Sequence, residues 1–344
     1  MSGTEAAVAA AVREAWTPLC DEVRVDALGN VAALLRADAP EAAAAGRRPP
    51  VLLLAAHTDE IGMVVTRIEK GGFLRLATIG GIDRRYLPGL AVLVHGRRDL
   101  PGLVGTLPPH LTAPESRSRP VALEDAFVDV GLPEPEVRAA VRVGDRVTVD
   151  RAVRRLLGEV VCGKAFDDRA SVAALHETLV RLRARRRRAD VLFVATVQEE
   201  VGLRGAAVAA HGLRPDVAVA VDVGFARQPG VAEHESLPMG QGPVVAQGAN
   251  FHPAVVGALR AAAAAEGVPH QAEYLPAQSG TDAWAIQVSG DGVPSGLLSL
   301  PLRYMHSPVE TLDLRDLRET GRLLAAFAAG LDRPWVEGLR RVLK

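Results

Sequence analysis

Four apolar runs in this chain each end close to side chains that can bind a metal ion. The run 51–56 is followed by His57, Asp59 and Glu60, and the run 191–197 is followed by Glu199 and Glu200. The run 217–221 is followed by Asp222, and the run 296–301 is followed by His306. Runs of this kind predict strands buried on both faces, as in a parallel sheet. Because open α/β sheets bind ligands beyond the carboxyl ends of their strands, these side chains are expected in one crevice. Such a set is typical of a metal-dependent hydrolase.

His57 and Asp59 form the first pair of interest. A metal-bound imidazole usually donates its second N–H group to a carboxylate, and this contact fixes its tautomer. Asp59 lies two residues after His57 and could play that part. Taken alone, however, a histidine at a strand end is more often a core or surface residue than a ligand.

Glu199 and Glu200 are the most informative pair, because they directly follow an apolar strand. Two adjacent acids are costly to bury there unless a cation lies nearby. With a metal present, one carboxylate can be a ligand while its neighbour accepts a proton from metal-bound water. The alternative for this pair in isolation is a polar loop at the strand end.

Three further acids and a histidine complete the set of candidates. Asp167 and Asp168 precede a predicted helix, where capping accounts for Asp168 but does not explain why Asp167 should face the crevice. Asp222 interrupts an apolar strand, so a partner for its carboxylate is expected. His306 supplies a second imidazole after the last strand. Two histidines with several carboxylates suit Zn²⁺ or another divalent first-row metal.

The elements that must position these residues fall into two patterns. The four apolar runs are accompanied by segments with helical spacing at 4–18, 171–185, 254–266 and 314–331. A strand pair is predicted at 23–35 and a loop at 37–50. Between them, short β-type pieces separated by Gly and Pro occupy 73–77, 90–95, 103–106, 127–130 and 146–149. The simplest architecture is α/β: a three-layer domain formed by 1–68 and 158–344, with a small all-β, barrel-like domain inserted at 69–157.

Composition excludes several classes of function. The net charge of −1 gives no reason to expect nucleic acid or an anionic membrane as a partner. No apolar run approaches the roughly 20 residues of a membrane span, and no signal peptide is expected. The arginine run 181–188 lies at the end of a predicted helix, where a solvated surface is the better interpretation. Two cysteines outside any metal-binding pattern, Cys20 and Cys162, favour a reducing cytoplasm.

At these residues the chain resembles the tetrahedral aminopeptidase family of dinuclear metallopeptidases, which includes glutamyl, leucyl and deblocking aminopeptidases. The matching stretches occur in the family's order and cover nearly the whole chain; they are Leu28–Asn30, His57–Gly62, Pro108–His110, Lys164–Arg169, Gln198–Gly202, Val221–Val223, Gly280–Asp282 and Arg303–Pro308. The resemblance implies a zinc-peptidase-like αβα domain. It also implies that the inserted β-domain helps to build a homo-oligomer, dimer-based and extending to a dodecamer, or acts as a lid.

The resemblance also implies a role for each candidate residue. One metal would be held by His57, Asp167 and Asp222 and the other by Asp167, Glu200 and His306, with Asp167 bridging the two. Glu199 would be the general base, and Asp59 would orient His57. Related enzymes have a cis peptide at the position of Asp167–Asp168, so a cis bond is expected there.

The resulting hypothesis is a cytoplasmic aminopeptidase that trims short peptides with two divalent metals, Zn²⁺ or Co²⁺ first and Mn²⁺ next. The metal pair would bind the scissile carbonyl and a water that Glu199 deprotonates. One alternative is a related di-metal hydrolase acting on another bond, such as a carboxypeptidase, a deacylase or a cellulase-like glycosidase. The other is a non-catalytic peptide-binding scaffold, which would be expected to lack the base or a ligand.

Overall fold

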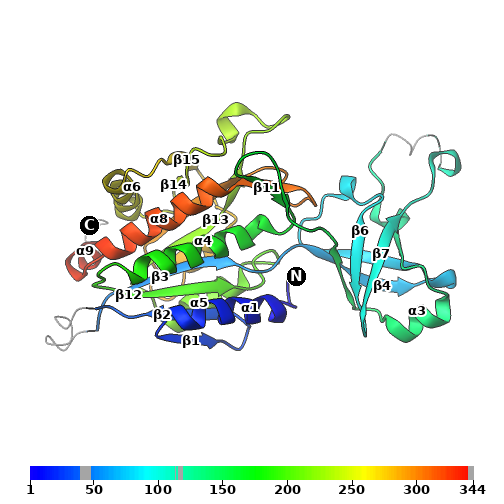
Figure 1. Cartoon of the computed structure of the whole chain (residues 1–344), viewed down its shortest axis with the longest axis horizontal. Helices are drawn as coiled ribbons and strands as arrows, with labels where there is room; N and C mark the ends of the chain where they lie inside the picture. The colour runs from blue at the N-terminus through cyan, green and yellow to red at the C-terminus, as the bar shows by residue number, and fades with distance from the viewer. Residues whose placement is uncertain (39–47, 113, 115–118, 340–344) are drawn as a thin grey trace.

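A mixed eight-stranded sheet forms the larger part of the computed structural model, which describes residues 1–38, 48–112, 114 and 119–339 (Figure 1). The four strands expected to carry the site are central and parallel neighbours, in the order β12-β3-β13-β16. Antiparallel β1 and β2 extend one side, as expected for the strand pair, and β14 and β15 extend the other. The strands are β1 (Glu22–Val25), β2 (Val31–Leu35), β3 (Val51–His57), β12 (Asp190–Thr196), β13 (Val217–Phe225), β14 (Val244–Gly248), β15 (Gln271–Leu275) and β16 (Ser295–Leu302).

Helices cover both faces of this sheet and give three layers. Alternate residues of β3 point to opposite faces, so Leu52 and Leu54 join one core cluster while Leu53 and Ala55 join another. The first cluster contains residues of α1 (Ala6–Trp16), α4 (Phe166–Arg183), α6 (Pro253–Glu266), α8 (Leu314–Gly330) and α9 (Arg333–Leu339), and the second contains residues of α5 (Arg204–Leu213) and α7 (Asp282–Gln287). Because both faces are covered, the central strands are apolar throughout, and the predicted α/β class is confirmed.

The longer predicted helices correspond to α4, α6 and α8, and the N-terminal one to α1. In α4 the buried Leu175, Leu179 and Leu182 form the apolar stripe that predicted it. Pro253 is the first residue of α6, and the Asp313 carboxylate caps α8 by accepting the N–H of Arg315. The helix at 171–185 begins earlier than expected, at Phe166.

A closed six-stranded barrel forms the second part of the molecule and lies apart from the sheet in Figure 1. Its strands in order of pairing are β4 (Gly62–Ile68), β5 (Leu74–Ile79), β8 (Phe127–Asp129), β7 (Asp99–Gly105), β6 (Ala91–His95) and β9 (Arg146–Val149), and the short α3 (Glu134–Ala140) packs Val137 on its core. Strand β4 pairs with β5 and β9, so residues 62–68 belong to the barrel by hydrogen bonding. The division of the chain into two domains at residues 69 and 157 remains a proposal.

A small three-stranded sheet joins the barrel to the helical layers. It consists of β10 (Arg154–Arg155), β11 (Val160–Gly163) and β17 (Glu310–Asp313). Gly163 pairs with Glu310 in its register, which brings Glu310 beside the start of α4.

The remaining regular elements are short 3₁₀ turns, η1 (Thr17–Leu19), η2 (Lys70–Gly72), η3 (Arg84–Tyr86), η4 (Pro109–Leu111), η6 (Leu123–Asp125) and η7 (Glu233–Glu235). The greater part of the loop predicted at 37–50, residues 39–47, lies outside the described residues. Within the described part of the chain, none of the helices has the length and apolar character to cross a membrane.

Candidate metal centre

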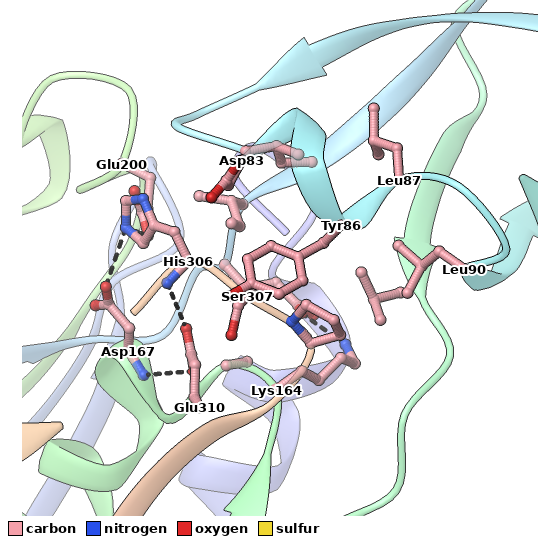
Figure 2. Close-up of a pocket in the computed structure, with 16 residues that line it drawn as sticks. Asp83, Tyr86, Leu87, Leu90, Lys164, Asp167, Glu200, His306, Ser307 and Glu310 are labelled. Atoms are coloured by element: carbon pink, nitrogen blue, oxygen red, sulfur yellow. Dashed lines mark hydrogen bonds and ion pairs between the residues drawn. The ribbon is translucent and has the colours of Figure 1, made fainter. Parts of the chain in front are cut away.

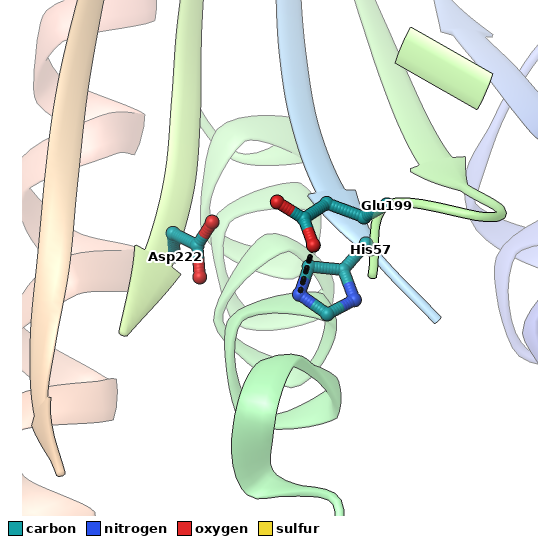
Figure 3. A group of neighbouring side chains, drawn as sticks. All are labelled: His57, Glu199 and Asp222. Atoms are coloured by element: carbon teal, nitrogen blue, oxygen red, sulfur yellow. Dashed lines mark ion pairs between the residues drawn. The ribbon is translucent and has the colours of Figure 1, made fainter. Parts of the chain in front are cut away.

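The carboxyl ends of three parallel strands place His57, Glu199 and Asp222 together (Figure 3). His57 is the last residue of β3 and pairs in register with Thr196, the last residue of β12, so the turn carrying Glu199 begins beside it. The His57 Nε2 atom lies 3.8 Å from Glu199 Oε2. All three side chains are buried.

Asp167 lies between the two histidines. Its Oδ1 is 3.1 Å from His57 Nε2 and its Oδ2 is 3.1 Å from His306 Nε2. His306 Nε2 is also 3.3 Å from Glu200 Oε1, and Figure 2 shows this group at the edge of a pocket beside η3. Each oxygen of the Asp167 carboxylate therefore faces a different histidine, as a bridging ligand would.

One cavity of about 240 Å³ contains every predicted ligand together with Glu199. The predicted ligands that line it are His57, Asp167, Glu200, Asp222 and His306. Donor atoms close enough to share an ion form two groups, His57 with Glu199 and Asp222, and His57 with Asp167 and Glu200. The five predicted ligands therefore converge on one cavity, as their positions at the strand ends predict. The resemblance implies that Asp167 shares an ion with His57 and Asp222, but Glu199 stands in its place in the first group. The distances alone therefore do not show whether Glu199 is a ligand or the general base.

Burial and mutual repulsion shift the pKa values of these groups strongly. Burial raises the pKa of Glu199 to about 10 and that of Asp222 to about 8. Burial lowers the pKa of His306, but contacts with Asp167 and Glu200 outweigh this and raise it to about 11. Burial also raises the pKa of Asp167, while contacts with both histidines lower it below its usual range.

A divalent cation fits this set of donors. Among the described residues, the nearby cations Lys164 and Arg169 are engaged with Glu60, at 2.6 Å and 3.1 Å, and neither forms an ion pair with the central acids. Glu200 Oε1 is buried, and its 3.3 Å contact with His306 Nε2 does not have the geometry of a hydrogen bond. Four carboxylates and two imidazoles gathered at the strand ends are compatible only if protons or metal ions compensate their charge, and the donor types suit zinc and its first-row neighbours.

Comparison with known proteins identifies the family. The model of the M42 glutamyl aminopeptidase family matches residues 42–323. The chain belongs to this family. Its members are metallopeptidases, so the chain is a hydrolase of the metallo-aminopeptidase type that uses divalent metal ions.

Relatives of this M42 peptidase match along most of their length. The lysyl aminopeptidase of Pyrococcus furiosus is 35% identical over 90% of this chain and 87% of its own. An aminopeptidase structure from Desulfurococcus kamchatkensis superposes with a TM-score of 0.90 at 36% identity, covering 98% of this chain and 93% of the other. The TET1 peptidase of Pyrococcus horikoshii, described as assembling into a tetrahedron or a large octahedral shell, gives 0.83 at 30% identity over 96% of each chain.

In this M42 peptidase Asp59 holds the turn that carries both glutamates. Its carboxylate accepts the backbone N–H groups of Glu199 (3.0 Å) and Glu200 (3.2 Å), and its Oδ1 lies 3.4 Å from His57 Nδ1. The Ser2 hydroxyl donates to the same carboxylate at 2.6 Å. Asp59 is fully buried, and its carboxylate connects Ser2, the turn of the two glutamates and the Nδ1 side of His57. The sequence alone does not indicate this contact of Ser2, because no local pattern relates it to position 59.

Two further carboxylates accept hydrogen bonds from the backbone of the candidate ligands. Glu310 accepts the N–H groups of Phe166 (2.7 Å) and Asp167 (3.2 Å) with one oxygen and that of His306 (3.0 Å) with the other. Asp168 accepts the backbone N–H of His57 at 3.1 Å. The peptide bond between Asp167 and Asp168 is cis, as predicted. The role of Glu310 was missed, since it depends on the pairing of β11 with β17 rather than on a sequence motif.

Proposed function

We propose that this chain is a two-metal aminopeptidase that releases single residues from the N-termini of short peptides. The observation that carries the proposal is Asp167, whose two oxygens each face one of the histidines at 3.1 Å. We assign His57, Asp167 and Asp222 to one ion and Asp167, Glu200 and His306 to the other. Zn²⁺ or Co²⁺ is the expected metal, with Mn²⁺ the next choice.

The metal pair, when bound, would polarise the scissile carbonyl and activate water. Glu199 takes a proton from the attacking water and returns it to the leaving amine. Burial, together with the neighbouring carboxylates, raises its pKa to about 10, so Glu199 would be protonated at neutral pH without a metal ion beside it. The positive charge of bound metal ions would lower the pKa of Glu199 and restore the carboxylate form that a base needs. Asp59 orients His57 and the Glu199 turn through the contacts given above.

We also propose that the protein acts in the cytoplasm as a homo-oligomer, built from dimers and extending to a dodecamer. The assembly of the TET1 relative supports this. The inserted region 69–157 would provide contacts between subunits or cover the site. Light scattering on the purified chain tests the assembly, and a monomer at micromolar concentration would contradict it.

The decisive experiment measures release of single residues from a panel of aminoacyl chromogens after chelation and separate addition of Zn²⁺, Co²⁺ and Mn²⁺. Activity should depend on metal and on a free α-amine, so N-acetylated versions of the same substrates should remain intact. Release of C-terminal residues or deacylation of blocked substrates would favour a related di-metal hydrolase. Metal-independent cleavage of cellulose derivatives would favour a glycosidase with two carboxylates across a sugar cleft. Peptide binding without any turnover would favour a scaffold.

A further inference from the structure

The preferred N-terminal residue is left open by the names of the relatives, which include both lysyl and glutamyl aminopeptidases. The structure offers its own indication in the cavities that flank the ligands. The cavity beside η3 has room for about one water-sized group, at about 30 Å³, whereas the cavity over the strand ends measures about 240 Å³. The cavity over the strand ends is the larger of the two and the better place for a long side chain.

The larger cavity leads from the metal ligands to Glu273 on strand β15. Glu273 is aligned with Ala246 of β14, and the strand order places it two strands from β16. Its carboxylate reaches back toward Gly224, since a Cβ atom built on that glycine would lie 3.9 Å from Glu273 Oε2. Gly224 follows Asp222 by two residues, so both are on one face of β13. A Cβ atom there would also lie 3.2 Å from Ser299 Cβ, so glycine keeps the cavity free of a side chain beside Ser299 and Glu273.

The walls of this passage are largely apolar and its end is anionic. Phe225, Leu275, Leu297 and Met305 line the cavity together with Glu273. No Lys or Arg of the described residues forms an ion pair with Glu273, which is half-buried, and burial raises the pKa of its carboxyl despite the Ser299 hydroxyl beside it. Ions bound by His57, Asp167, Asp222 and Glu200 would neutralise the acids near the reaction centre. These ions would leave the Glu273 carboxylate, which lies on β15 at the side of the sheet, without a counter-charge.

We propose that Glu273 selects peptides whose N-terminal residue has a long cationic side chain, lysine first and arginine next. The inference rests on the proposed aminopeptidase function, which places the scissile carbonyl at the metal ligands. A lysine side chain can lay its four methylene groups along apolar walls while its ammonium group remains paired with a carboxylate. A leucine would leave the acid unpaired, and a glutamate would be repelled by it.

Binding tests the proposal without turnover. L-lysine and L-norleucine have the same stem and differ in the terminal ammonium group, and both are titrated calorimetrically into the metal-loaded protein. The wild type should bind lysine more tightly by about 10- to 100-fold, the usual value of a hydrogen bond to a charged group. Glu273→Gln should remove most of this difference, while Glu14→Gln, an exposed acid on α1, should preserve it. Equal binding of both ligands by the wild type would overturn the proposal.

Kinetics separates this inference from the function on which it rests. The ratio of kcat/KM for lysyl and norleucyl p-nitroanilides should fall toward one in Glu273→Gln, with norleucyl turnover retained. Glu273→Lys should move the preference to glutamyl substrates. Robust turnover with no preference for lysine, or with a cationic preference only at the second residue of dipeptides, would refute the role of Glu273 and leave the aminopeptidase intact. Failure to cleave any of the aminoacyl substrates would refute the proposed function itself.

Discussion

The carboxyl end of the central sheet and the core of the barrel are buried in opposite ways. Among the described residues, the buried side chains of the barrel strands are apolar, for example Leu74, Val92 and Val147. At the sheet end, Asp59, Asp167 and Asp222 are equally buried and are ionisable. The barrel gains stability directly from the removal of apolar surface from water. The sheet end buries charges that are costly without a compensating cation.

The comparison shows that the carboxyl end of the sheet contains buried charges that lower stability, whereas the described part of the barrel core contains none. In the sheet, the covered apolar strands provide the stable framework, and the residues at and just beyond their carboxyl ends are the candidate metal ligands. Changes at the sheet end should therefore alter metal binding and turnover, whereas changes in the barrel core should alter stability. The predictions below test this separation, from the largest expected effect to the smallest.

The sharpest test compares the two adjacent glutamates. Glu199→Gln should keep both metals, because no assigned ligand is lost, and should lower kcat by about 10²–10⁴-fold, as expected for loss of a general base. Glu200→Gln should lose metal and activity together. Metal content by mass spectrometry beside steady-state kinetics decides the matter.

The outcome for Glu199 has particular weight because its carboxylate lies with His57 and Asp222 in a possible ion-binding group. If Glu199→Gln emptied the site while Glu200→Gln remained loaded, the two roles would have to be exchanged. If both variants lost metal, Glu199 would be a ligand as well, and the base would have to be sought elsewhere.

The barrel side of the comparison is tested by Leu74→Ala. Leu74 is fully buried in the barrel core, so the truncation should destabilise the protein by about 2–5 kcal/mol, the usual cost of a large-to-small change in a core. Leu103→Ala, at a leucine of the same barrel that is 59% exposed, should have little effect on stability. Denaturant unfolding measures both variants. The folded Leu74→Ala protein should keep the wild-type kcat, and a large loss of kcat would link the barrel core to the chemistry.

Much of this arrangement could be predicted from the sequence because the relevant signals are local. Apolar runs of 51–56 and 217–221 predict buried parallel strands, and polar residues at their ends predict a site, so His57 and Asp222 were found together. Helices such as α4 were found from a stripe of leucines. These signals depend on the spacing of neighbours along the chain and need no knowledge of the tertiary structure.

The residues that were missed depend on contacts between distant segments. Glu310 supports Asp167 only because β17 pairs with β11, and Ser2 reaches Asp59 across 57 positions. Strands β14 and β15 were not predicted either. Strand β15 is only partly buried, so its pattern lacks the continuous apolar run of the central strands. Glu273 lies on this strand, and no motif singled it out.

Glu310 allows the support of the metal site to be tested apart from the ligands. Glu310→Gln keeps the size of the side chain, but its amide has one oxygen where the carboxylate has two. It cannot accept the N–H groups of both Asp167 and His306 as the carboxylate does. Metal affinity should weaken by about 10–100-fold, as is usual when a residue that orients ligands is changed. Competition with a chromogenic chelator measures the affinity, and Glu134→Gln on the barrel helix α3 is a control remote from the site. Unchanged affinity would show that β17 does not position the ligands.

The smallest expected effect of a substitution is a change of about one proton in the number released when metal binds, and its sign follows from His306. Without metal, the carboxylates of Asp167 and Glu200 raise the pKa of His306 to about 11, so its imidazole is protonated at pH 7. A metal requires the neutral ring, and binding must therefore release this proton. Affinity should rise by about tenfold for each pH unit between 6 and 8 for every proton displaced.

Calorimetry in buffers of different ionisation enthalpy counts the protons released. The wild type should release at least one proton, with further release from Asp222, whose pKa burial raises to about 8. His306→Ala should release about one fewer, whereas His234→Ala, at an exposed histidine on η7, should match the wild type. An affinity that did not change with pH would mean that the two histidines are already neutral in the metal-free protein. The carboxylates facing them would then be ionised as well, because a proton on a ligand carboxylate would also have to leave when the metal binds, and the assignment of a protonated His306 to the metal-free site would be wrong.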